Sequence, residues 1–271
     1  MRKVAIQGKL ASYHDIAAKK FFGQDTQTVN FDLPFKNVFK GLKKHGNAVV
    51  AIENSLYGSI NEVYDLLASN KYQIVGEVYL RIEHCLIGTP GATIKNLTEV
   101  HSHPIALAQC ENYLDSTLKH VQRFEHFDTA GSVEAAKQWS NPKIAAIASK
   151  EAATLHDMEI LAKNIETNKE NYTRFVVLST QEKRQSMPTK ASLILKTADK
   201  PGALHEALGV FTQLNLNLSK LESRPIIGKA WHYMFYIDIE SPDINSKLEL
   251  AIKDLLLKRC EVQLLGAYEK G

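Results

Sequence analysis

Short apolar runs alternate with amphipathic segments along the first 180 residues of the chain. Residues 4–7, 29–31 and 48–52 are apolar enough for buried strands, whereas residues 12–22 show the three- to four-residue spacing of a helix. Pro34 suits the first position of a second helix, because the amide hydrogen that proline lacks would be unpaired there in any case. Strands that alternate with helices are typical of α/β folds with a mainly parallel sheet.

The alternation continues through the middle of the chain. Strands are predicted at residues 74–80, 85–87, 121–124 and 144–148. Helices are predicted after Ser59, which would form a capping box with Glu62, from 102–104 through Leu114, from 128 through Trp139, and from near Ser149. We therefore expect two α/β lobes with a cleft between them.

A polar segment at residues 180–190 separates two parts of the chain. It contains Pro188 and shows no periodicity, which indicates a linker between a domain at residues 1–180 and a domain at residues 190–271. Beyond it, strand and helix patterns follow at residues 192–196, 202–214, 218–223, 231–239, 244–257 and 262–265. This βαββαβ order is that of a ferredoxin-like domain.

Composition excludes several classes of protein. The 271 residues are 44% hydrophobic, and the formal charge of +3 comes from 33 basic and 30 acidic residues scattered along the chain, so we expect no nucleic-acid partner. The three cysteines form no C-x-x-C pair, which indicates neither a disulfide framework nor a zinc site and suits a reduced cytosol. No apolar run approaches membrane length, and the run at the start is broken at Gln7 and Lys9. We expect a cytoplasmic protein with no membrane partner.

The most informative polar residues are Thr173 and Arg174, which precede the apolar run at residues 176–178. An arginine can hold a carboxylate through two parallel N–H···O bonds, and the hydroxyl of Thr173 would then face whatever the anion carries. The alternative interpretation is a polar pair that opens a strand at the surface.

A second group of polar residues follows the predicted strand at residues 48–52. Ligands of open α/β sheets bind at the carboxyl ends of strands, so Asn54, Ser55 and Gly58 are candidates for the cleft. Predicted helix starts near Ser12, Ser59 and Ser132 offer backbone N–H groups to an anion, although plain capping of the helix is the more common role of such serines.

Several motifs occur in order along the chain. They are residues 52–55 with Gly58, residues 102–104 with Ala106 and Leu107, and residues 128–132, 171–175, 202–205 and 222–225. Together they resemble the prephenate dehydratase family with its C-terminal ACT regulatory domain, over nearly the whole chain. The resemblance implies a two-lobed catalytic domain like that of periplasmic binding proteins, followed by the ferredoxin-like ACT domain.

The resemblance also implies an activity. A carbon–oxygen lyase of this family converts prephenate to phenylpyruvate in phenylalanine biosynthesis, with loss of carbon dioxide and water and without cofactor or metal. Thr173 matches the catalytic threonine, as a hydrogen-bond donor to the leaving hydroxyl. The substrate-binding residues would be Arg174, Ser12, Asn54, Ser55, Gly58, Thr129, Ala130, Gly131 and Ser132.

The C-terminal motifs resemble those that bind L-phenylalanine as an allosteric effector between paired ACT domains, which implies a homodimer or homotetramer. The residues involved would be Gly202, Ala203, Leu204, His205, Asn217, Leu218, Glu222, Ser223, Arg224 and Pro225. Ordinary turn chemistry explains Gly202 equally well, and Arg224 could simply pair with Glu222.

One motif departs from the family, which usually has Gly-Pro-x-Gly-Thr-Phe-Ser where this chain has residues 8–14. Lys9 and His14 add cationic or titratable groups near the expected cleft. Two alternatives stay open. Arogenate dehydratase acts on a substrate with an amino group in place of the keto oxygen, and Lys9 and His14 would disfavour that ammonium. A non-catalytic ligand-sensing protein would also have two lobes, but neither a secretory signal nor a helix-turn-helix is evident.

Overall fold

The computed structural model describes residues 2–181 and 187–271. The chain forms two compact units, Met1–Val63 with Val78–Phe175 and Tyr64–Glu77 with Val176–Gly271. Part of the predicted linker, residues 182–186, lies outside the described residues. The predicted division at residues 1–180 and 190–271 stays a proposal, since residues 64–77 group with the C-terminal unit.

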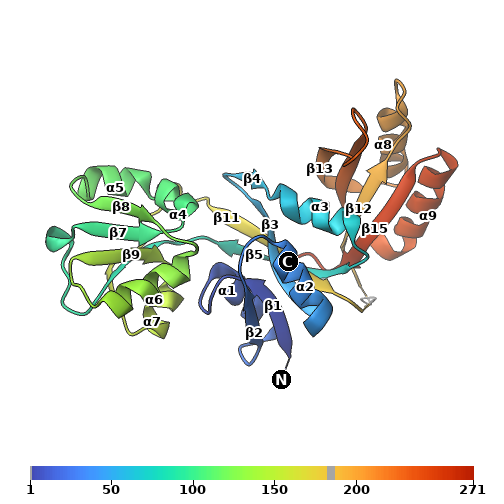
Figure 1. The fold of residues 1–271 in the computed structure, drawn as a ribbon. Coiled ribbons are helices and arrows are strands. Elements are labelled where there is room, and N and C mark those ends of the chain that lie inside the picture. The colour runs from blue at the N-terminus through green and yellow to red at the C-terminus, as the bar shows by residue number, and fades with distance from the viewer. Residues whose placement is uncertain (1, 182–186) are drawn as a thin grey trace. The chain divides into compact units, whose positions relative to one another are not determined.

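The first sheet follows the predicted alternation. Its elements are β1 (Lys3–Gln7), α1 (Tyr13–Phe22), β2 (Gln27–Phe31), α2 (Lys36–His45), β3 (Asn47–Asn54), β4 (Gly58–Ser59), α3 (Asn61–Ser69), β5 (Gln73–Arg81) and β11 (Tyr172–Ser179). The strand order is β2-β1-β3-β11-β5, with β4 paired to β3, and β1 runs parallel to both β2 and β3 (Figure 1). Ser12 caps α1 and Gly23 ends it, as its pattern predicts.

Two predicted helix starts in this region are wrong. Helix α2 begins at Lys36, two residues after Pro34. Ser59 belongs to β4 and pairs with Glu53, so it does not cap α3, which begins at Asn61. Glu62 instead accepts the backbone N–H of Lys36 at 3.2 Å. The carboxylate of Glu62, near the start of α3, thus binds the start of α2. The local sequence around Glu62 does not indicate this distant partner.

The second sheet lies in the first unit. It is built from β6 (Cys85–Gly88), β7 (Glu99–Ser102), α4 (Pro104–Gln109), α5 (Glu111–Thr117), β8 (Gln122–Glu125), α6 (Thr129–Trp139), β9 (Ile144–Ala148), α7 (Lys150–Leu155) and β10 (Glu159–Ala162), with a 3-10 turn at Ile94–Asn96. The strand order is β10-β6-β9-β7-β8. The helix predicted through Leu114 is interrupted at Cys110, and the four-residue strands β7 and β10 were not predicted.

Helices cover both faces of this second sheet, with α4 and α5 on one side and α6 and α7 on the other (Figure 1). Ala146 and Ala148 of β9 pack with α6 and α7, whereas Ala145 and Ile147 pack with α4 and α5. Because both faces are buried, the strand reads as one continuous apolar run.

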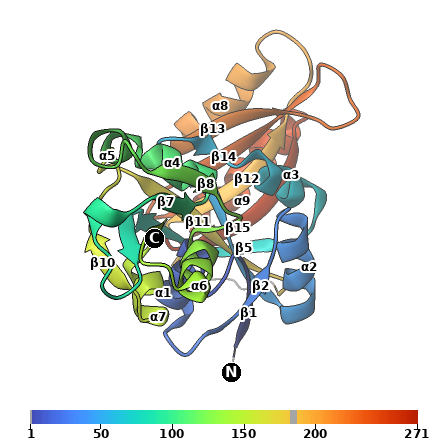
Figure 2. The same cartoon turned by 60° about the vertical axis from the view of Figure 1, so that its left-hand side comes forward.

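The C-terminal unit contains the predicted βαββαβ fold. Its elements are β12 (Lys190–Lys196), α8 (Ala203–Gln213), β13 (Asn217–Pro225), β14 (Tyr233–Glu240), α9 (Ile244–Leu257) and β15 (Glu261–Tyr268). The antiparallel order is β13-β14-β12-β15 (Figure 2). Alternate residues of β12, among them Leu193 and Leu195, pack against α8 and α9 in one core.

Segment Tyr64–Glu77 contacts the other face of this sheet. Tyr236 donates its hydroxyl hydrogen to the carbonyl of Tyr64, and Arg224 pairs with Asp65 at 2.9 Å. Gly266 approaches the carbonyl of Ile74 so closely that a Cβ atom would lie 2.0 Å from that oxygen. These contacts explain why residues 64–77 belong to the C-terminal unit. Among the described residues, no helix is long and apolar enough to cross a membrane.

Candidate active site

A cavity of about 520 Å³ opens within the first unit, which is a size typical of small-molecule sites. Its apolar wall includes Leu33, Phe35, Ile60, Ile82, Ile105 and Phe175. Its polar groups come from the ends of β1 and β3, the start of α1, the loops before α4 and α6, and β11. The carboxyl ends of parallel strands therefore contribute to the site, as the sequence predicts.

Strand β11 presents only one of the two predicted key residues to this cavity. Thr173 and Phe175 line it, whereas Arg174 between them does not. Arg174 is 5% exposed, and its Nη1 lies 3.8 Å from Oε2 of Glu53. Successive side chains of a strand point to opposite faces, so adjacent residues cannot both face one cavity from a regular strand. The predicted convergence of Thr173 and Arg174 on one pocket is not found here.

Asn54 fixes the hydroxyl of Thr173. The Nδ2 atom of Asn54 lies 2.9 Å from Oγ1 of Thr173 and 2.8 Å from Oδ1 of Asn171. The Oδ1 atom of Asn54 accepts the backbone N–H groups of Leu56 and Tyr57, at 2.9 and 3.1 Å. Only this orientation of the amide satisfies all four contacts, so the amide must donate to Thr173.

This hydrogen bond has a direct consequence for chemistry. Oγ1 of Thr173 acts as the acceptor toward Asn54, and among the described residues the hydroxyl makes no other hydrogen bond. Its own hydrogen therefore remains available to a ligand in the cavity. The arrangement provides a neutral donor at a fixed position in a largely apolar site.

Of the other residues predicted to bind substrate near β3 and α1, Ser12 and Gly58 line the cavity and Ser55 does not. Ser12 lines the cavity and caps α1, with Oγ accepting the N–H of Asp15 at 3.4 Å. Gly58 also lines it. Ser55 does not, because its hydroxyl donates to the carbonyl of Glu170 at 2.8 Å and accepts the N–H of Tyr172 at 2.9 Å. Ser55 thus joins the loop after β3 to the start of β11.

The start of α6 contributes less than predicted. Thr129 and Asp128 line the cavity, but Ala130, Gly131 and Ser132 do not. Asp128 is the capping residue and accepts the N–H of Gly131 at 2.6 Å, so a carboxylate already occupies this helix start. Ser132 is fully buried and donates to the carbonyl of Thr129 at 2.6 Å.

The cavity wall contains a chain of hydrogen-bonded polar side chains that was not predicted from the sequence. The Tyr13 hydroxyl donates to the carbonyl of Glu83 at 2.7 Å and lies 3.1 Å from Nδ1 of His84. Nε2 of His84 lies 2.7 Å from Oε1 of Gln109. Burial lowers the pKa of His84 and raises that of Tyr13. The available signal was His84, directly before an apolar strand pattern, and Gln109, within the predicted helix.

Lys9 and His14, the two unusual residues of the N-terminal motif, have different surroundings in the structure. His14 lines the cavity, but Lys9 does not. Lys9 is half-exposed and forms an ion pair with Glu134 of α6. Of these two residues, only His14 is therefore placed to contact a ligand in the cavity and to disfavour an ammonium group on the substrate. Among the described residues, no group of three or more His, Cys, Asp or Glu side chains is placed to hold a metal ion.

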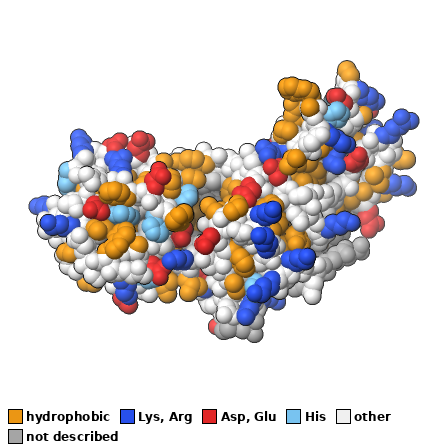
Figure 3. Space-filling view, in the orientation of Figure 1, with side chains coloured by type: hydrophobic (Ala, Val, Ile, Leu, Met, Phe, Trp, Pro, Cys, Tyr) orange, Lys and Arg blue, Asp and Glu red, His pale blue; other side chains and the backbone are white. Residues whose placement is uncertain are grey.

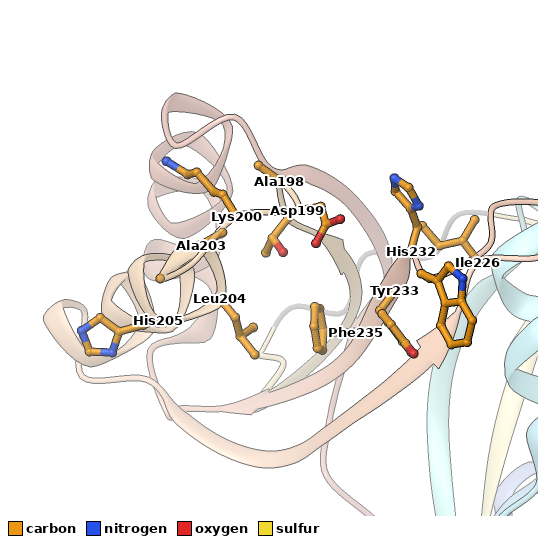
Figure 4. A pocket seen from close by; sticks show the side chains of 13 residues that line it. Ala198, Asp199, Lys200, Ala203, Leu204, His205, Ile226, His232, Tyr233 and Phe235 are labelled. Carbon is orange, nitrogen blue, oxygen red and sulfur yellow. The ribbon is translucent and has the colours of Figure 1, made fainter.

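The C-terminal unit has a separate cavity of about 310 Å³ (Figure 4). Gly202, Ala203, Leu204 and His205 line it, opposite Phe235 and other residues of the β13–β14 region. The other six predicted effector residues do not line it; they are Asn217, Leu218, Glu222, Ser223, Arg224 and Pro225. Arg224 pairs with Asp65 and Glu222 with Lys220, so the predicted pairing of Arg224 with Glu222 is not found.

Figure 3 shows basic, acidic and hydrophobic side chains interspersed over much of the visible face.

Comparison with known proteins places these features in a family. The prephenate dehydratase family matches residues 4–183, and the ACT domain family matches residues 191–257. The bifunctional chorismate mutase/prephenate dehydratase of Enterobacter agglomerans is 34% identical over 278 residues, which cover 98% of this chain and 70% of that protein.

Solved structures agree with this assignment. Prephenate dehydratase from Arthrobacter aurescens, in complex with L-Phe, superposes with a TM-score of 0.87 at 25% identity, covering 98% of this chain and 89% of that one. GqqA, described as a novel type of quorum quenching acylase, has a TM-score of 0.87 at 30% identity and covers 100% of this chain and 98% of that one. By its sequence, its two domains and its fold, the chain belongs to the prephenate dehydratase family.

Proposed function

We propose that this protein is a lyase that converts prephenate to phenylpyruvate. The observation that carries the proposal is the Thr173 hydroxyl, held by Asn54 in a cavity of small-molecule size with its hydrogen available. The reaction breaks the C–O bond of the ring hydroxyl and the C–C bond of the ring carboxylate. The electron pair of the second bond enters the ring, which becomes aromatic, and carbon dioxide and water leave with consumption of one proton.

Thr173 is the proposed catalytic residue. A threonine hydroxyl holds its proton too tightly to act as an ordinary acid near neutral pH, so it stabilises the charge on the leaving oxygen or passes on a proton from another donor. The apolar wall with Phe35, Ile82 and Phe175 leaves the departing carboxylate poorly solvated, which favours its conversion to uncharged carbon dioxide.

The proposed substrate contacts follow from the cavity wall. Ser12, Asn54, Gly58 and Thr129 lie on it and are proposed to contact the substrate. Arg174, Ser55, Ala130, Gly131 and Ser132 remain proposed members of the binding region, with Arg174 and Ser55 supporting the loop after β3 through Glu53 and the start of β11. A cytoplasmic location and a homo-oligomer complete the proposal.

The direct test is formation of phenylpyruvate. Purified protein is mixed with prephenate, and phenylpyruvate is followed by its ultraviolet absorbance against a sample without protein. Formation at a rate proportional to protein concentration is expected. Absence of phenylpyruvate with a folded protein would refute the proposed activity.

Asn54 offers a test of the positioning of Thr173. Replacement by alanine should lower kcat about 10- to 100-fold, because the hydroxyl loses the donor that fixes it. Asn54→Asp is the more selective change, since a carboxylate cannot donate to Oγ1 and would instead accept the hydrogen that the substrate needs. We expect Asn54→Asp to lose at least as much activity as Asn54→Ala, measured as kcat with prephenate. A fully active Asn54→Asp variant would contradict this role.

Regulation is a separate part of the proposal. We propose that L-phenylalanine binds the C-terminal unit and lowers the activity by favouring one global state of the protein. Leu204, Tyr233 and Phe235 on the wall of this cavity offer apolar surface to an aromatic side chain. Adding phenylalanine at fixed prephenate should reduce the initial rate, and calorimetry should detect binding over the same concentration range. Binding without any change in rate would exclude inhibition.

A further inference from the structure

His14 lies in the cavity wall at a position where this chain departs from the family motif. It belongs to α1, is 8% exposed, and contacts the rings of Phe35 and Phe175, with centroid distances of 5.9 and 5.1 Å. Both of these phenylalanines line the same cavity. The imidazole is therefore held between two apolar side chains, with one edge accessible to a ligand.

The hydrogen bond to Ala51 determines which ring nitrogen carries the proton. The backbone N–H of Ala51 donates to Nε2 of His14 at 3.1 Å. Nε2 must be unprotonated to accept, so in the neutral ring the hydrogen is on Nδ1. Burial lowers the pKa of His14 to about 3, which agrees with a neutral ring at physiological pH.

Among the described residues, the Nδ1–H group has no hydrogen-bond acceptor. Across the part of the chain that the structure describes, the contact with Ala51 is the only hydrogen bond of the His14 ring, and Nδ1 is not among the buried polar atoms without a partner. Nδ1 is therefore reachable from the cavity. Phe175, which touches the ring, is two residues from Thr173 along β11, a separation of roughly 7 Å. Thr173 and His14 both line the cavity, so a single ligand can contact both.

We propose that the Nδ1–H of His14 donates a hydrogen bond to the keto oxygen of the substrate side chain and makes the cavity select a 2-keto acid over the corresponding 2-amino acid. This inference rests on the proposed function, because it assumes that the leaving hydroxyl lies at Thr173. The pyruvyl side chain and the ring carboxylate are both attached to the ring carbon opposite that hydroxyl, and the proposed orientation directs them toward His14.

The keto oxygen is the better acceptor for two reasons. A hydrogen bond to the ring carboxylate would stabilise it before the reaction more than during loss of carbon dioxide, which would slow the step. An ammonium group in place of the keto oxygen offers only hydrogen-bond donors, so it would face the Nδ1–H donor without an acceptor. Rejecting an analogue by an unmatched polar group is an effective source of specificity.

The side chains of glutamine and asparagine separate the two nitrogens of His14. In His14→Gln, the amide oxygen can replace Nε2 as acceptor for Ala51, but the donor at the Nδ1 position is lost. In His14→Asn, the amide nitrogen can replace Nδ1 as donor, but Ala51 loses its acceptor. His120→Gln, at an exposed histidine outside the cavity, is the matched control.

The experiment measures kcat/KM for prephenate and for arogenate with all four proteins. We expect wild type, His120→Gln and His14→Asn to prefer prephenate. His14→Gln should reduce the prephenate-to-arogenate ratio roughly tenfold or more. An unchanged ratio in folded His14→Gln overturns the inference. An equal loss for both substrates also overturns it, because the donor would then serve the carboxylate that both share.

A binding measurement keeps this inference separate from the proposed reaction. If wild type binds prephenate without producing phenylpyruvate, the proposed activity fails, but dissociation constants for prephenate and arogenate still test His14. A preference for the keto acid that disappears in His14→Gln supports its role. No preference in wild type, or a preference that survives in His14→Gln, overturns it.

Discussion

Replacing Thr173 by alanine is expected to lower kcat with prephenate by about 100- to 1,000-fold, the usual cost of removing one preorganised donor to developing charge. The hydroxyl is fixed by Asn54, so its effect does not depend on ordering a mobile group during the reaction. The change removes only the hydroxyl group and one methyl group from a buried strand residue. The overall fold should therefore remain, with a small loss of stability because Asn54 loses one acceptor.

The comparison of Thr173→Ala with Thr173→Ser isolates the hydroxyl. Serine keeps the oxygen within reach of Asn54 but loses a methyl group, so it should retain much more activity than alanine. Thr173→Val has the shape of threonine without the oxygen and should resemble alanine. The measurement is kcat and KM from phenylpyruvate formation, with circular dichroism as the check on folding. Wild-type turnover in Thr173→Ala would exclude a catalytic role for this residue.

The fold was predictable where local pattern and tertiary environment agree. The run at residues 144–148 is continuously apolar because β9 is covered on both faces, and the βαββαβ order of the C-terminal unit follows from clear strand and helix periods. The prediction of local structure failed where a residue distant in the sequence determines which hydrogen bonds form. The Glu62 carboxylate binds the start of α2, so the local capping pattern with Ser59 does not form.

The site was predictable in part for a similar reason. Thr173 and Asn54 lie on the same cavity because β3 and β11 are neighbours in the sheet, but their hydrogen bond joins residues 119 positions apart. Arg174 was predicted to face the same pocket as Thr173, but it does not line the cavity. Successive side chains of β11 point to opposite faces of the sheet, and Thr173 is the one that faces the cavity. The chain of Tyr13, His84 and Gln109 combines three separate segments, and no sequence spacing relates them.

Replacing Lys190 by methionine should lower the free energy of unfolding by about 3–5 kcal/mol, the usual cost of leaving buried charges without a partner. Lys190 begins β12 and is 2% exposed. Its Nζ lies 3.1 Å from Glu77, 3.8 Å from Asp238 and 3.6 Å from Glu240. Glu77 and Asp238 are also buried, so loss of the ammonium would leave two carboxylates close together in a poorly solvated site.

The same strand provides a control for this prediction. Lys196, at the other end of β12, pairs with Glu261 at 2.9 Å, but its side chain is 40% exposed and that of Glu261 is 74% exposed. Lys196→Met should therefore cost at most about 1 kcal/mol. Urea unfolding followed by circular dichroism would give both values. Glu77→Gln introduced into Lys190→Met should recover part of the loss, because it removes one of the two uncompensated charges. If Lys190→Met and Lys196→Met lower the free energy of unfolding equally, the burial of Lys190 does not determine its contribution to stability. Glu77 would then not depend on Lys190 for charge compensation.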